Sequence, residues 1–475
     1  MSISQTPALP LEAPADLPRT LGALRASGHR HVSVKEELRA NLVARMRAGQ
    51  DRFPGVVGYE DTVAPELERA LLAGHDVVLL GERGQGKTRL LRSLVGLLDE
   101  WTPVIEGSEL NEHPYAPLTP ASRRRVAAEG EDLPVAWLHR SLRYGEKLAT
   151  PDTSVGDLIG DVDPVKVAEG RALGDPETIH FGLVPRTNRG VFAINELPDL
   201  AERIQVSLLN VLEERDIQVR GYQLRLPLDL LLVASANPED YTNRGRIITP
   251  LKDRFGAEVR THYPLEVSLE VDLVRQEAAT VAEVPGHLLE VLARFTRAVR
   301  ESPAVDPASG VSARFAIAAA ETVSAAALRR HALSGERTEP VARVGDLHTV
   351  VSVLGGKVEF EQGEEGREIE VLEHLLRTAI AETYRSLLGG AELSGFSELV
   401  TDGRTIETGD LVPAERLLEQ VGKVHGLSQV LERLGLEDAT PGRAASGVEF
   451  VLESLHLTRR LDKLVLDDGR TVYGS

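Results

Sequence analysis

Apolar and polar residues alternate with two different periods in the first half of the chain, and this predicts strands that alternate with helices. Three short runs that are almost wholly apolar are typical of buried strands: residues 76–80, 191–194 and 230–236. Four segments carry apolar residues at helical spacing: residues 33–48, 62–73, 89–98 and 201–214. Because such an alternation favours parallel strands, we expect an α/β domain built on a parallel sheet.

The remaining segments are less regular. Residues 1–30 contain four prolines and are expected to form a mobile leader, and residues 100–155 are polar with little periodicity. Residues 217–226 alternate like a hairpin, and from residue 266 onward the pattern is almost wholly helical. Ser33, with a Glu three residues later, matches a capping box at the start of the helix over 33–48.

The segment after the first strand reads Gly81-Glu82-Arg83-Gly84-Gln85-Gly86-Lys87-Thr88, which is a complete phosphate-binding loop. Small residues let the N–H groups of such a loop face a phosphate, and the helix that follows adds the positive end of its dipole. Lys87 is expected to reach the β- and γ-phosphates, and the Thr88 hydroxyl is expected to bind Mg²⁺. The sequence therefore predicts a site for ATP and Mg²⁺.

Composition narrows the range of partners. The formal charge of −19 argues against sequence-independent binding of nucleic acid, because such binding needs many Lys and Arg side chains that contact phosphates. The chain has no cysteine, which excludes disulfides and thiol catalysis and fits a reducing cytosol. We find no signal peptide and no apolar run long enough to cross a bilayer, so we expect a cytoplasmic protein with no membrane partner.

Phosphoryl transfer to water also needs a metal anchor, a group that orients water and a sensor for the γ-phosphate. Asn195 and Glu196 end the second strand, where Glu196 suits the polarisation of water and Asn195 stands as a neutral residue in the position of a metal anchor. Asn237 ends the third strand, where its amide can face the γ-phosphate or the attacking water. The structural alternatives are a helix cap at Asn195 and Glu196 and a simple turn at Asn237.

Two arginines are candidates for the positive charge that stabilises the transition state. Arg254 follows the third predicted strand, residues 230–236, and Arg314 lies at the start of a predicted helix. The structural alternative is surface charge for both, with Arg254 in an ion pair beside an acidic neighbour. Five histidines show no metal-ligand spacing, and we expect structural or surface roles for them: His29, His31, His113, His180 and His262.

Taken together, these residues resemble the AAA+ ATPases, and within them the I subunit of magnesium chelatase and its MoxR-like relatives. The resemblance runs from about Phe53 to about Gly355. Its most specific parts are the phosphate-binding loop and the segments 181–196, 236–240 and 253–256. Residues 153–161 look like the segment that leads into the family's inserted hairpin, and residues 217–226 look like its second insertion.

The resemblance implies an αβα nucleotide domain and a small helical lid, assembled as a homo-hexameric ring with ATP between subunits. It assigns the Walker A roles to Lys87 and Thr88, catalysis to Glu196, sensor 1 to Asn237, the finger donated in trans to Arg254 and sensor 2 to Arg314. The family has Asp where Asn195 stands. The implied domains are residues 1–50 (leader and helix), 51–265 (nucleotide-binding domain), 266–357 (lid) and 358–475 (a mainly helical region without a counterpart).

Three functions stay open from the sequence. The first is an ATP-hydrolysing ring that remodels a protein client or complex, with a von Willebrand A domain partner and a role in metal or cofactor insertion. The second is a sigma-54-type transcriptional activator, although the Gly-Ala-Phe-Thr-Gly-Ala loop of that class is absent from the sequence. The third is an ATP-gated scaffold with little hydrolysis, which the neutral Asn195 motivates.

Overall fold

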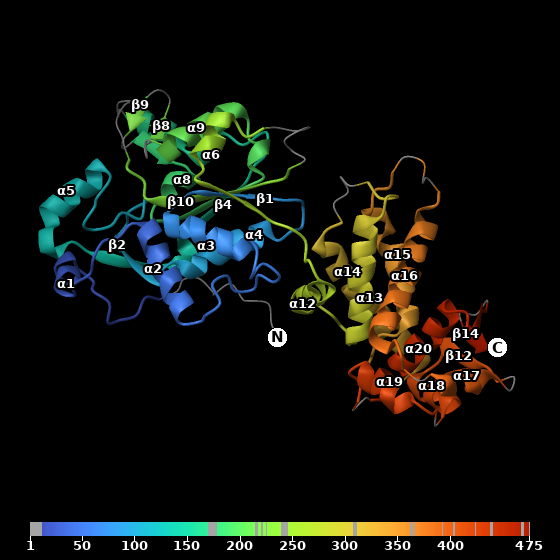
Figure 1. Cartoon of the computed structure of the whole chain (residues 1–475). Helices are drawn as coiled ribbons and strands as arrows, with labels where there is room; N and C mark the ends of the chain where they lie inside the picture. Colours follow the sequence, from blue (N-terminus) through green and yellow to red (C-terminus); the bar gives the residue numbers. More distant parts are fainter. Residues whose placement is uncertain are drawn as a thin grey trace. The chain divides into compact units, whose positions relative to one another are not determined.

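The structure of the chain is a computed structural model. It describes residues 12–169, 178–213, 217–219, 222–224, 226–238, 246–306, 311–361, 363, 366–391, 393–401, 404–422, 424–437, 440–466 and 470–474. The chain divides into two compact units, residues 1–262 and residues 263–475, and Figure 1 shows both.

The N-terminal unit is built on a five-stranded parallel sheet, as the sequence predicts. The strands lie in the order β11 (Ala257–Arg260), β1 (Val77–Leu80), β10 (Leu230–Ala236), β7 (Gly190–Asn195) and β4 (Tyr144–Leu148). Every neighbouring pair in this sheet is parallel. The carboxyl ends of β1, β10 and β7 therefore meet at one edge of the sheet, which is where open α/β sheets bind their ligands.

Helices cover both faces of this sheet, because its central strands are apolar on both sides. Val77 and Leu79 share a core with the helices α2 (Val34–Arg47), α3 (Val63–Ala73) and α4 (Lys87–Ser93). Val78 and Leu80 face the opposite side and share a core with α6 (Val155–Leu158), α8 (Leu183–Arg186), α9 (Glu202–Glu213) and α11 (Thr249–Arg254). Figure 1 shows these three layers, which form the expected αβα arrangement.

The predicted helices and hairpin are largely confirmed. Ser33 caps α2 in a capping box with Glu36, as the sequence indicates. The helix expected over 89–98 begins earlier, at Lys87, and ends at Ser93, after which residues 94–97 form a 3₁₀ turn. The hairpin expected over 217–226 is β8 (Ile217–Val219) paired with β9 (Tyr222–Leu224), and a second hairpin pairs β5 (Gly160–Val162) with β6 (Ile179–Phe181).

The region 100–155 is more regular than its sequence suggests, and the expectation of an irregular segment was wrong. It forms the antiparallel pair β2 (Trp101–Ile105) and β3 (Val135–His139), the helix α5 (Pro120–Glu129) and the strand β4. β4 reads Tyr-Gly-Glu-Lys-Leu and lies at the edge of the main sheet. An edge strand that is only partly buried does not need an apolar run, so hydrophobic periodicity does not reveal it.

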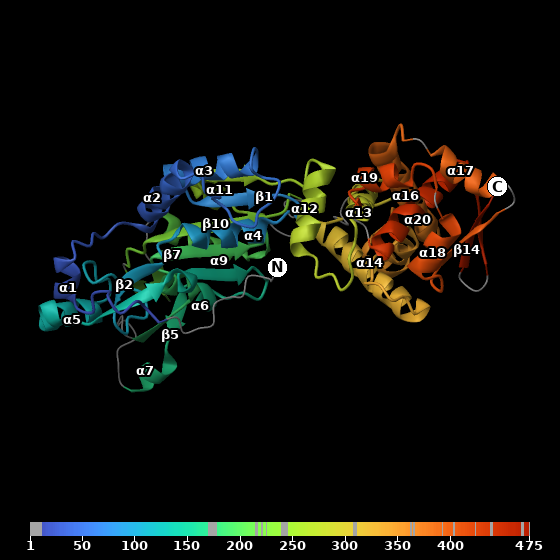
Figure 2. The same cartoon turned by 90° about the horizontal axis from the view of Figure 1, so that it is seen from below.

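The expectation of a mobile leader was also wrong for residues 12–30. There, α1 (Leu21–Ala26) buries Leu21 and Leu24, and Leu21 shares a small core with Leu133. The Trp137 indole Nε1 donates a hydrogen bond to the Pro18 carbonyl at 2.7 Å. Figures 1 and 2 show α1, α5 and β2 gathered at one end of the unit. Residues 1–11 lie outside the described residues.

The C-terminal unit is mainly helical, as predicted. Its helices are α12 (Val267–Glu277), α13 (Gly286–Glu301), α14 (Ala313–Ser334), α15 (His348–Leu354), α16 (Glu368–Leu388), α17 (Ser394–Thr401), α18 (Ala414–Val421), α19 (Leu427–Arg433) and α20 (Pro441–Leu457). The sequence did not predict its antiparallel sheet, ordered β12 (Ile406–Gly409), β14 (Arg470–Gly474) and β13 (Asp462–Val465). Within the described parts of the chain, no helix is long and apolar enough to cross a membrane.

Candidate functional site

The phosphate-binding loop joins β1 to α4 at the carboxyl edge of the sheet. Gly84 and Gly86 have φ values of 74° and 76°, a backbone conformation that glycine adopts without strain. A Cβ placed on Gly86 would meet no protein atom within 4 Å. The loop therefore curls around open space, which is the geometry that a cradle for phosphate requires.

Buried side chains hold this loop in place. Gln85 accepts a hydrogen bond through its side-chain Oε1 from the Thr261 hydroxyl at 2.8 Å. The Tyr59 hydroxyl donates to the Gln85 carbonyl and, at 2.9 Å, to the His262 carbonyl. Burial raises the pKa of Tyr59 to about 12, so the phenol keeps its proton at neutral pH. The Gln85 side chain thus anchors the loop to the end of β11, whereas Glu82 and Arg83 are exposed.

Lys87 connects the loop to the end of β10. Its buried ammonium donates to the Glu82 carbonyl and to Asn237 Oδ1, each at 2.7 Å, and also to the Gly81 carbonyl. An ammonium can only donate, so the amide oxygen of Asn237 faces Lys87 and the amide nitrogen points away. That Nδ2 is buried and has no hydrogen-bond partner among the described residues. Asn237 therefore presents an unused donor beside the loop.

Thr88, the next residue, meets the end of β7. Its hydroxyl donates to Asn195 Oδ1 at 3.2 Å, and the Ser235 hydroxyl donates to the same oxygen at 3.3 Å. Asn195 Nδ2 donates in turn to Glu146 Oε1 at 2.8 Å. Every polar atom of the Asn195 side chain is thus engaged, and a carboxylate lies directly beside this neutral residue.

Glu146 comes from β4, the strand that the sequence did not reveal. Arg92 donates two hydrogen bonds to its carboxylate, at 2.8 and 2.9 Å, and the Tyr144 hydroxyl donates a third at 3.1 Å. Burial alone would raise the pKa of Glu146, but Arg92, Tyr144 and Asn195 together bring it below its ordinary value. Glu146 is therefore ionised at neutral pH, and its carboxylate, paired with Arg92, lies beside the neutral Asn195.

Glu196 adopts an unusual backbone conformation. Its φ and ψ are 56° and 49°, in the left-handed region that residues other than glycine rarely occupy. The Glu196 N–H donates to the Ser235 hydroxyl at 3.2 Å, which holds this turn against β10. Its half-buried carboxylate has no hydrogen-bond partner within the described residues. Backbone strain of this kind, about 1–3 kcal/mol, persists where the surrounding structure fixes it and is common at functional sites.

The two predicted arginines lie outside this hydrogen-bonded cluster. Arg254 ends α11, where its half-exposed side chain pairs with Glu213 at the end of α9. Arg314 is exposed near the start of α14 and belongs to the C-terminal unit. Within a single chain, Arg254 thus forms the surface ion pair that was the structural alternative for it.

Comparison with curated proteins finds relatives among the subunits of magnesium chelatase. The magnesium-chelatase subunit ChlI of Nostoc sp. strain PCC 7120 is 28% identical over 235 residues, which is 48% of this chain and 58% of that protein. The magnesium-chelatase 38 kDa subunit of Cereibacter sphaeroides is 29% identical over 244 residues, 49% of this chain and 64% of that protein. The chain has the fold of the AAA+ ATPases and is similar to the I subunit of magnesium chelatase. It spans about three fifths of the length of these relatives.

Two further similarities concern parts of this AAA+ protein. Residues 169–254 match the family described as "Sigma-54 interaction domain". Among solved structures, a complex between subunits BchI and BchD of magnesium chelatase is similar, with 22% identity and a TM-score of 0.35, over 70% of this chain and 95% of the other. The matched segment 169–254 contains Asn195, Glu196, Asn237 and Arg254, the predicted site residues that follow the phosphate-binding loop.

Sequence reasoning missed two members of the AAA+ site, Glu146 and Ser235. Ser235 lies inside an otherwise apolar strand, and that polar interruption was the available signal for it. Glu146 lies in a polar segment with no strand signal, so only the neutral residue at 195 hinted that a carboxylate comes from elsewhere. Glu146 accepts a hydrogen bond from Asn195, and Ser235 hydrogen-bonds to both Asn195 and Glu196.

Three of the histidines gather in the AAA+ unit, away from the residues described above. His29 Nε2 lies 3.1 Å from His113 Nε2, and the His31 and His113 ring centroids are 4.4 Å apart. Burial lowers the pKa of His113 to about 2, and the nearby charge of Arg189 acts in the same direction. In the described residues, no group of three or more His, Asp or Glu side chains is arranged to hold a metal.

Proposed function

We propose that the chain binds ATP with Mg²⁺ at the carboxyl edge of its parallel sheet and hydrolyses it. The observation that carries this proposal is that Lys87 hydrogen-bonds to Asn237 and Thr88 hydrogen-bonds to Asn195, which joins the loop to the ends of two neighbouring strands. The buried, unpartnered Nδ2 of Asn237 is a donor of the kind that phosphate oxygens satisfy. Open space at Gly86 and the ammonium of Lys87 fit the same polyphosphate.

Each residue takes a distinct role in this proposal. Lys87 and Asn237 hold phosphate oxygens, and the Thr88 hydroxyl is the direct ligand for Mg²⁺, which when bound offsets phosphate charge. Asn195 Oδ1 accepts the hydrogen bond of the Thr88 hydroxyl and so would keep the oxygen of Thr88 turned toward Mg²⁺, while the ionised Glu146 lies beside Asn195. Glu196, whose carboxylate has no hydrogen-bond partner within the described residues, polarises the attacking water and accepts its proton. Because the carboxylate of Glu146 lies beside Asn195, we favour ATP hydrolysis over an ATP-gated scaffold with little hydrolysis.

We further propose that the active form is a homo-hexameric ring, in which Arg254 reaches the nucleotide of the adjoining subunit. Exposed ion pairs contribute only about 0.2–1 kcal/mol, so Arg254 can exchange Glu213 for a phosphate at little expense. Arg314, exposed on the C-terminal unit, takes the sensor 2 role. The proposed division is a nucleotide-binding domain over 51–265, a lid over 266–357 and a further region over 358–475.

Titration calorimetry with Lys87→Ala tests nucleotide binding. Loss of the buried ammonium removes its charge-assisted hydrogen bonds, so we expect ATP affinity to fall about 100-fold or more. Lys252→Ala is the matched control, because Lys252 is an exposed lysine of the same unit and its loss should leave affinity unchanged. Equal affinity of Lys87→Ala and the unchanged protein would reject the site.

A mixing experiment tests the trans role of Arg254. Lys87→Ala and Arg254→Ala should each be inactive alone, the first because it cannot bind ATP and the second because it cannot complete its neighbour's site. In a mixture, a Lys87→Ala subunit offers an intact Arg254 to a neighbour that binds ATP, so partial ATPase activity should return. A mixture that forms hexamers by light scattering and stays inactive would show that Arg254 does not act in trans.

The proposed task of the ring is to remodel a protein client or complex in the cytoplasm. The relatives are named as subunits, which supports a partner protein for this chain as well. The proposal has two more specific versions. In one, the ring works with a von Willebrand A domain protein, as in a MoxR-like pair. In the other, it assists the insertion of a metal or cofactor. A pulldown with a hydrolysis-deficient Glu196→Gln variant in ATP tests them, and capture of no partner beyond the level seen with Lys87→Ala would reject them.

A sigma-54-type activator is the second candidate, because residues 169–254 match the sigma-54 interaction domain. The match includes the Asn195–Glu196 segment but lies in a chain with a formal charge of −19 and without the Gly-Ala-Phe-Thr-Gly-Ala loop. We therefore expect no ATP-dependent stimulation of transcription by RNA polymerase bearing sigma-54. Stimulation that disappears in Lys87→Ala would make this candidate the better one.

A further inference from the structure

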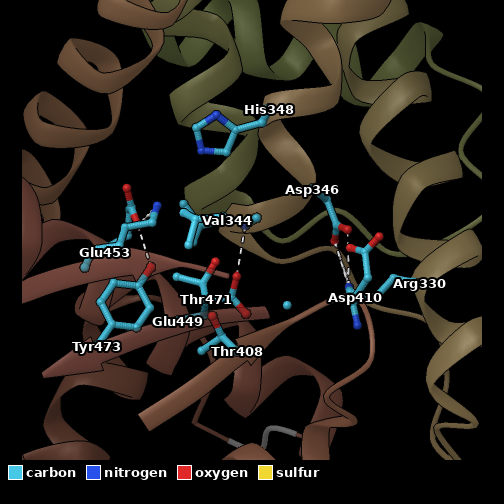
Figure 3. Close-up of a pocket in the computed structure, with 14 residues that line it drawn as sticks. Arg330, Val344, Asp346, His348, Thr408, Asp410, Glu449, Glu453, Thr471 and Tyr473 are labelled. Atoms are coloured by element: carbon cyan, nitrogen blue, oxygen red, sulfur yellow. Dashed lines mark hydrogen bonds and ion pairs between the residues drawn. The ribbon is translucent and has the colours of Figure 1, made fainter. Parts of the chain in front are cut away.

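A cavity of about 300 Å³ lies inside the C-terminal unit, apart from the nucleotide site. Its size is at the lower end of the range for small-molecule sites. One wall is the three-stranded sheet, and the others come from α14, α20 and the 3₁₀ turn before α15 (Figure 3). The side chains that matter for its chemistry are Arg330, Asp346, Thr408, Glu449, Glu453 and Lys463.

Most charges around this cavity are already paired. Asp346 lies 3.2 Å from Arg330, and Glu453 lies 2.7 Å from Lys463. Glu449 differs from these carboxylates because it forms no ion pair within the described residues. Its side chain is 3% exposed, and its Oε1 accepts one hydrogen bond, from the Gly345 N–H at 3.0 Å. Within the described residues its Oε2 has no partner. Because Glu449 lines the cavity, a donor that enters the cavity can reach this oxygen.

Two hydroxyl groups stand beside that carboxylate. Thr408 and Thr471 lie directly opposite each other in the antiparallel pair β12–β14, so their side chains share the face of the sheet that lines the cavity. Thr408 is 2% exposed, and neither hydroxyl has a hydrogen-bond partner within the described residues. Figure 3 shows both threonines next to Glu449. Three oxygens that can accept hydrogen bonds therefore face one space.

We propose that this cavity binds a small molecule through a primary ammonium group, held by Glu449, Thr408 and Thr471. An ammonium has three N–H donors and no acceptor, which matches one carboxylate oxygen and two hydroxyls. Of the four carboxylates that line the cavity, Asp346, Glu453 and Asp410 are paired with Arg330, Lys463 and Arg329, which leaves Glu449 to receive a positive ligand. A metal ion fits less well, because the described residues hold no group of three or more carboxylates and histidines in ligating positions.

The charge state of Glu449 gives the site a pH dependence. Burial raises the pKa of Glu449, and the positive charges of Arg343 and Arg330 oppose that effect. An ammonium favours the ionised carboxylate, so its affinity should increase as pH rises through the pKa of Glu449 in the free protein. The other titratable and charged groups that line the space come from the elements packed around it and are Arg330, Asp346, His348, Asp410, Glu453, Lys463 and Tyr473.

The test is calorimetry of the full chain with putrescine, L-lysine and methylammonium, with butane-1,4-diol as the uncharged control for putrescine. We expect at least one ammonium probe to bind once per chain with a Kd of about 1 mM or tighter, and the diol not to bind. Glu449→Gln keeps an oxygen for the Gly345 N–H but loses the charge, so it should weaken binding about tenfold or more. Thr408→Val should weaken it without a change of charge.

Glu407→Gln is the matched control. Glu407 neighbours Thr408 on β12 but pairs with Arg416 at 2.9 Å, on the side away from the cavity, so its variant should bind the probe normally. Thermal unfolding and ATP binding of each variant show that the fold is kept. The proposal is overturned if no ammonium probe binds to protein that binds ATP, or if Glu449→Gln binds the probe as well as Glu407→Gln does.

Discussion

Replacing Asn195 by Asp tests the contact with Glu146 that only the structure reveals. Asn195 Nδ2 donates to Glu146 Oε1 at 2.8 Å, so Asn195→Asp replaces a hydrogen bond by two facing carboxylates. From the sequence alone, this change is expected to preserve or raise activity at low Mg²⁺, because it restores the acidic residue usual in the family. The structure predicts instead that the nucleotide-free protein loses stability.

Coulomb's law gives the size of this loss. Two unit charges at the observed 2.8 Å repel each other by about 6 kcal/mol at an effective dielectric constant of about 20. Arg92, which donates two hydrogen bonds to Glu146, also attracts the new carboxylate, and a nearby opposite charge typically offsets roughly 1.4–4 kcal/mol. We therefore expect the free energy of unfolding to fall by about 2–4 kcal/mol at about pH 8.

The loss should depend on pH with a definite sign. Two facing carboxylates share a proton, which raises the pKa of the pair above its value in the unfolded chain. Stability from such a group is present at low pH and is lost as pH rises through the raised pKa. The stability of Asn195→Asp should thus approach that of the unchanged protein as pH falls toward about 5.

Urea unfolding followed by tryptophan fluorescence measures this effect selectively. Trp101 and Trp137 are the two tryptophans of the chain, and both lie in the N-terminal unit, so the signal reports on that unit. In the double variant Asn195→Asp with Glu146→Gln, the new carboxylate accepts a hydrogen bond from the new amide, and stability should rise above that of Asn195→Asp alone. Unchanged stability of Asn195→Asp at about pH 8, or strictly additive effects in the double variant, would refute the reasoning.

Two other perturbations use the same fluorescence signal. Glu37→Gln leaves Arg143, its partner at 2.6 Å, as a fully buried charge without a counter-ion, and should lower the free energy of unfolding by about 3–5 kcal/mol. Glu36→Gln, in the exposed capping box of the same helix, should change the free energy of unfolding by about 1 kcal/mol or less. Equal losses of unfolding free energy in the two variants would contradict the role of the Glu37–Arg143 ion pair. His113 has a pKa of about 2 in the folded state, so below about pH 6.5 only the unfolded chain takes up its proton, which lowers stability by about 1.4 kcal/mol per pH unit as pH falls. His113→Asn should therefore lose stability less steeply between about pH 6.5 and 5, and parallel slopes would contradict the assignment.

The sequence alone was sufficient to predict the central strands of the N-terminal unit. The strands β1, β7 and β10 are buried on both faces, so they appear as apolar runs. Their positions in the chain already place the phosphate-binding loop, Asn195 and Asn237 at strand ends. What the pattern cannot give is the hydrogen bonding between them, such as that from Lys87 to Asn237. That contact depends on β1 and β10 being neighbours, which is a property of the sheet order.

The parts that sequence reasoning missed share a physical cause. β4 and the strands β12–β14 are short and partly exposed, so hydrophobic burial does not determine their composition and leaves no periodic signal. Glu146 was missed because it lies on β4. The roles proposed for Arg254 and Arg314 would depend on other copies or on another unit, so the pattern of one chain identifies these arginines only as candidates.

The most direct test of the account compares ATP binding and ATP turnover in Glu196→Gln. The amide keeps the size of the side chain but cannot accept a proton from water, so the variant should bind ATP with Mg²⁺ as tightly as the unchanged protein while its turnover falls by about 100-fold or more. Glu202→Gln, an exposed residue of α9, should match the unchanged protein in both measurements. Turnover in Glu196→Gln equal to that in Glu202→Gln would contradict the assignment of Glu196 as the group that activates water.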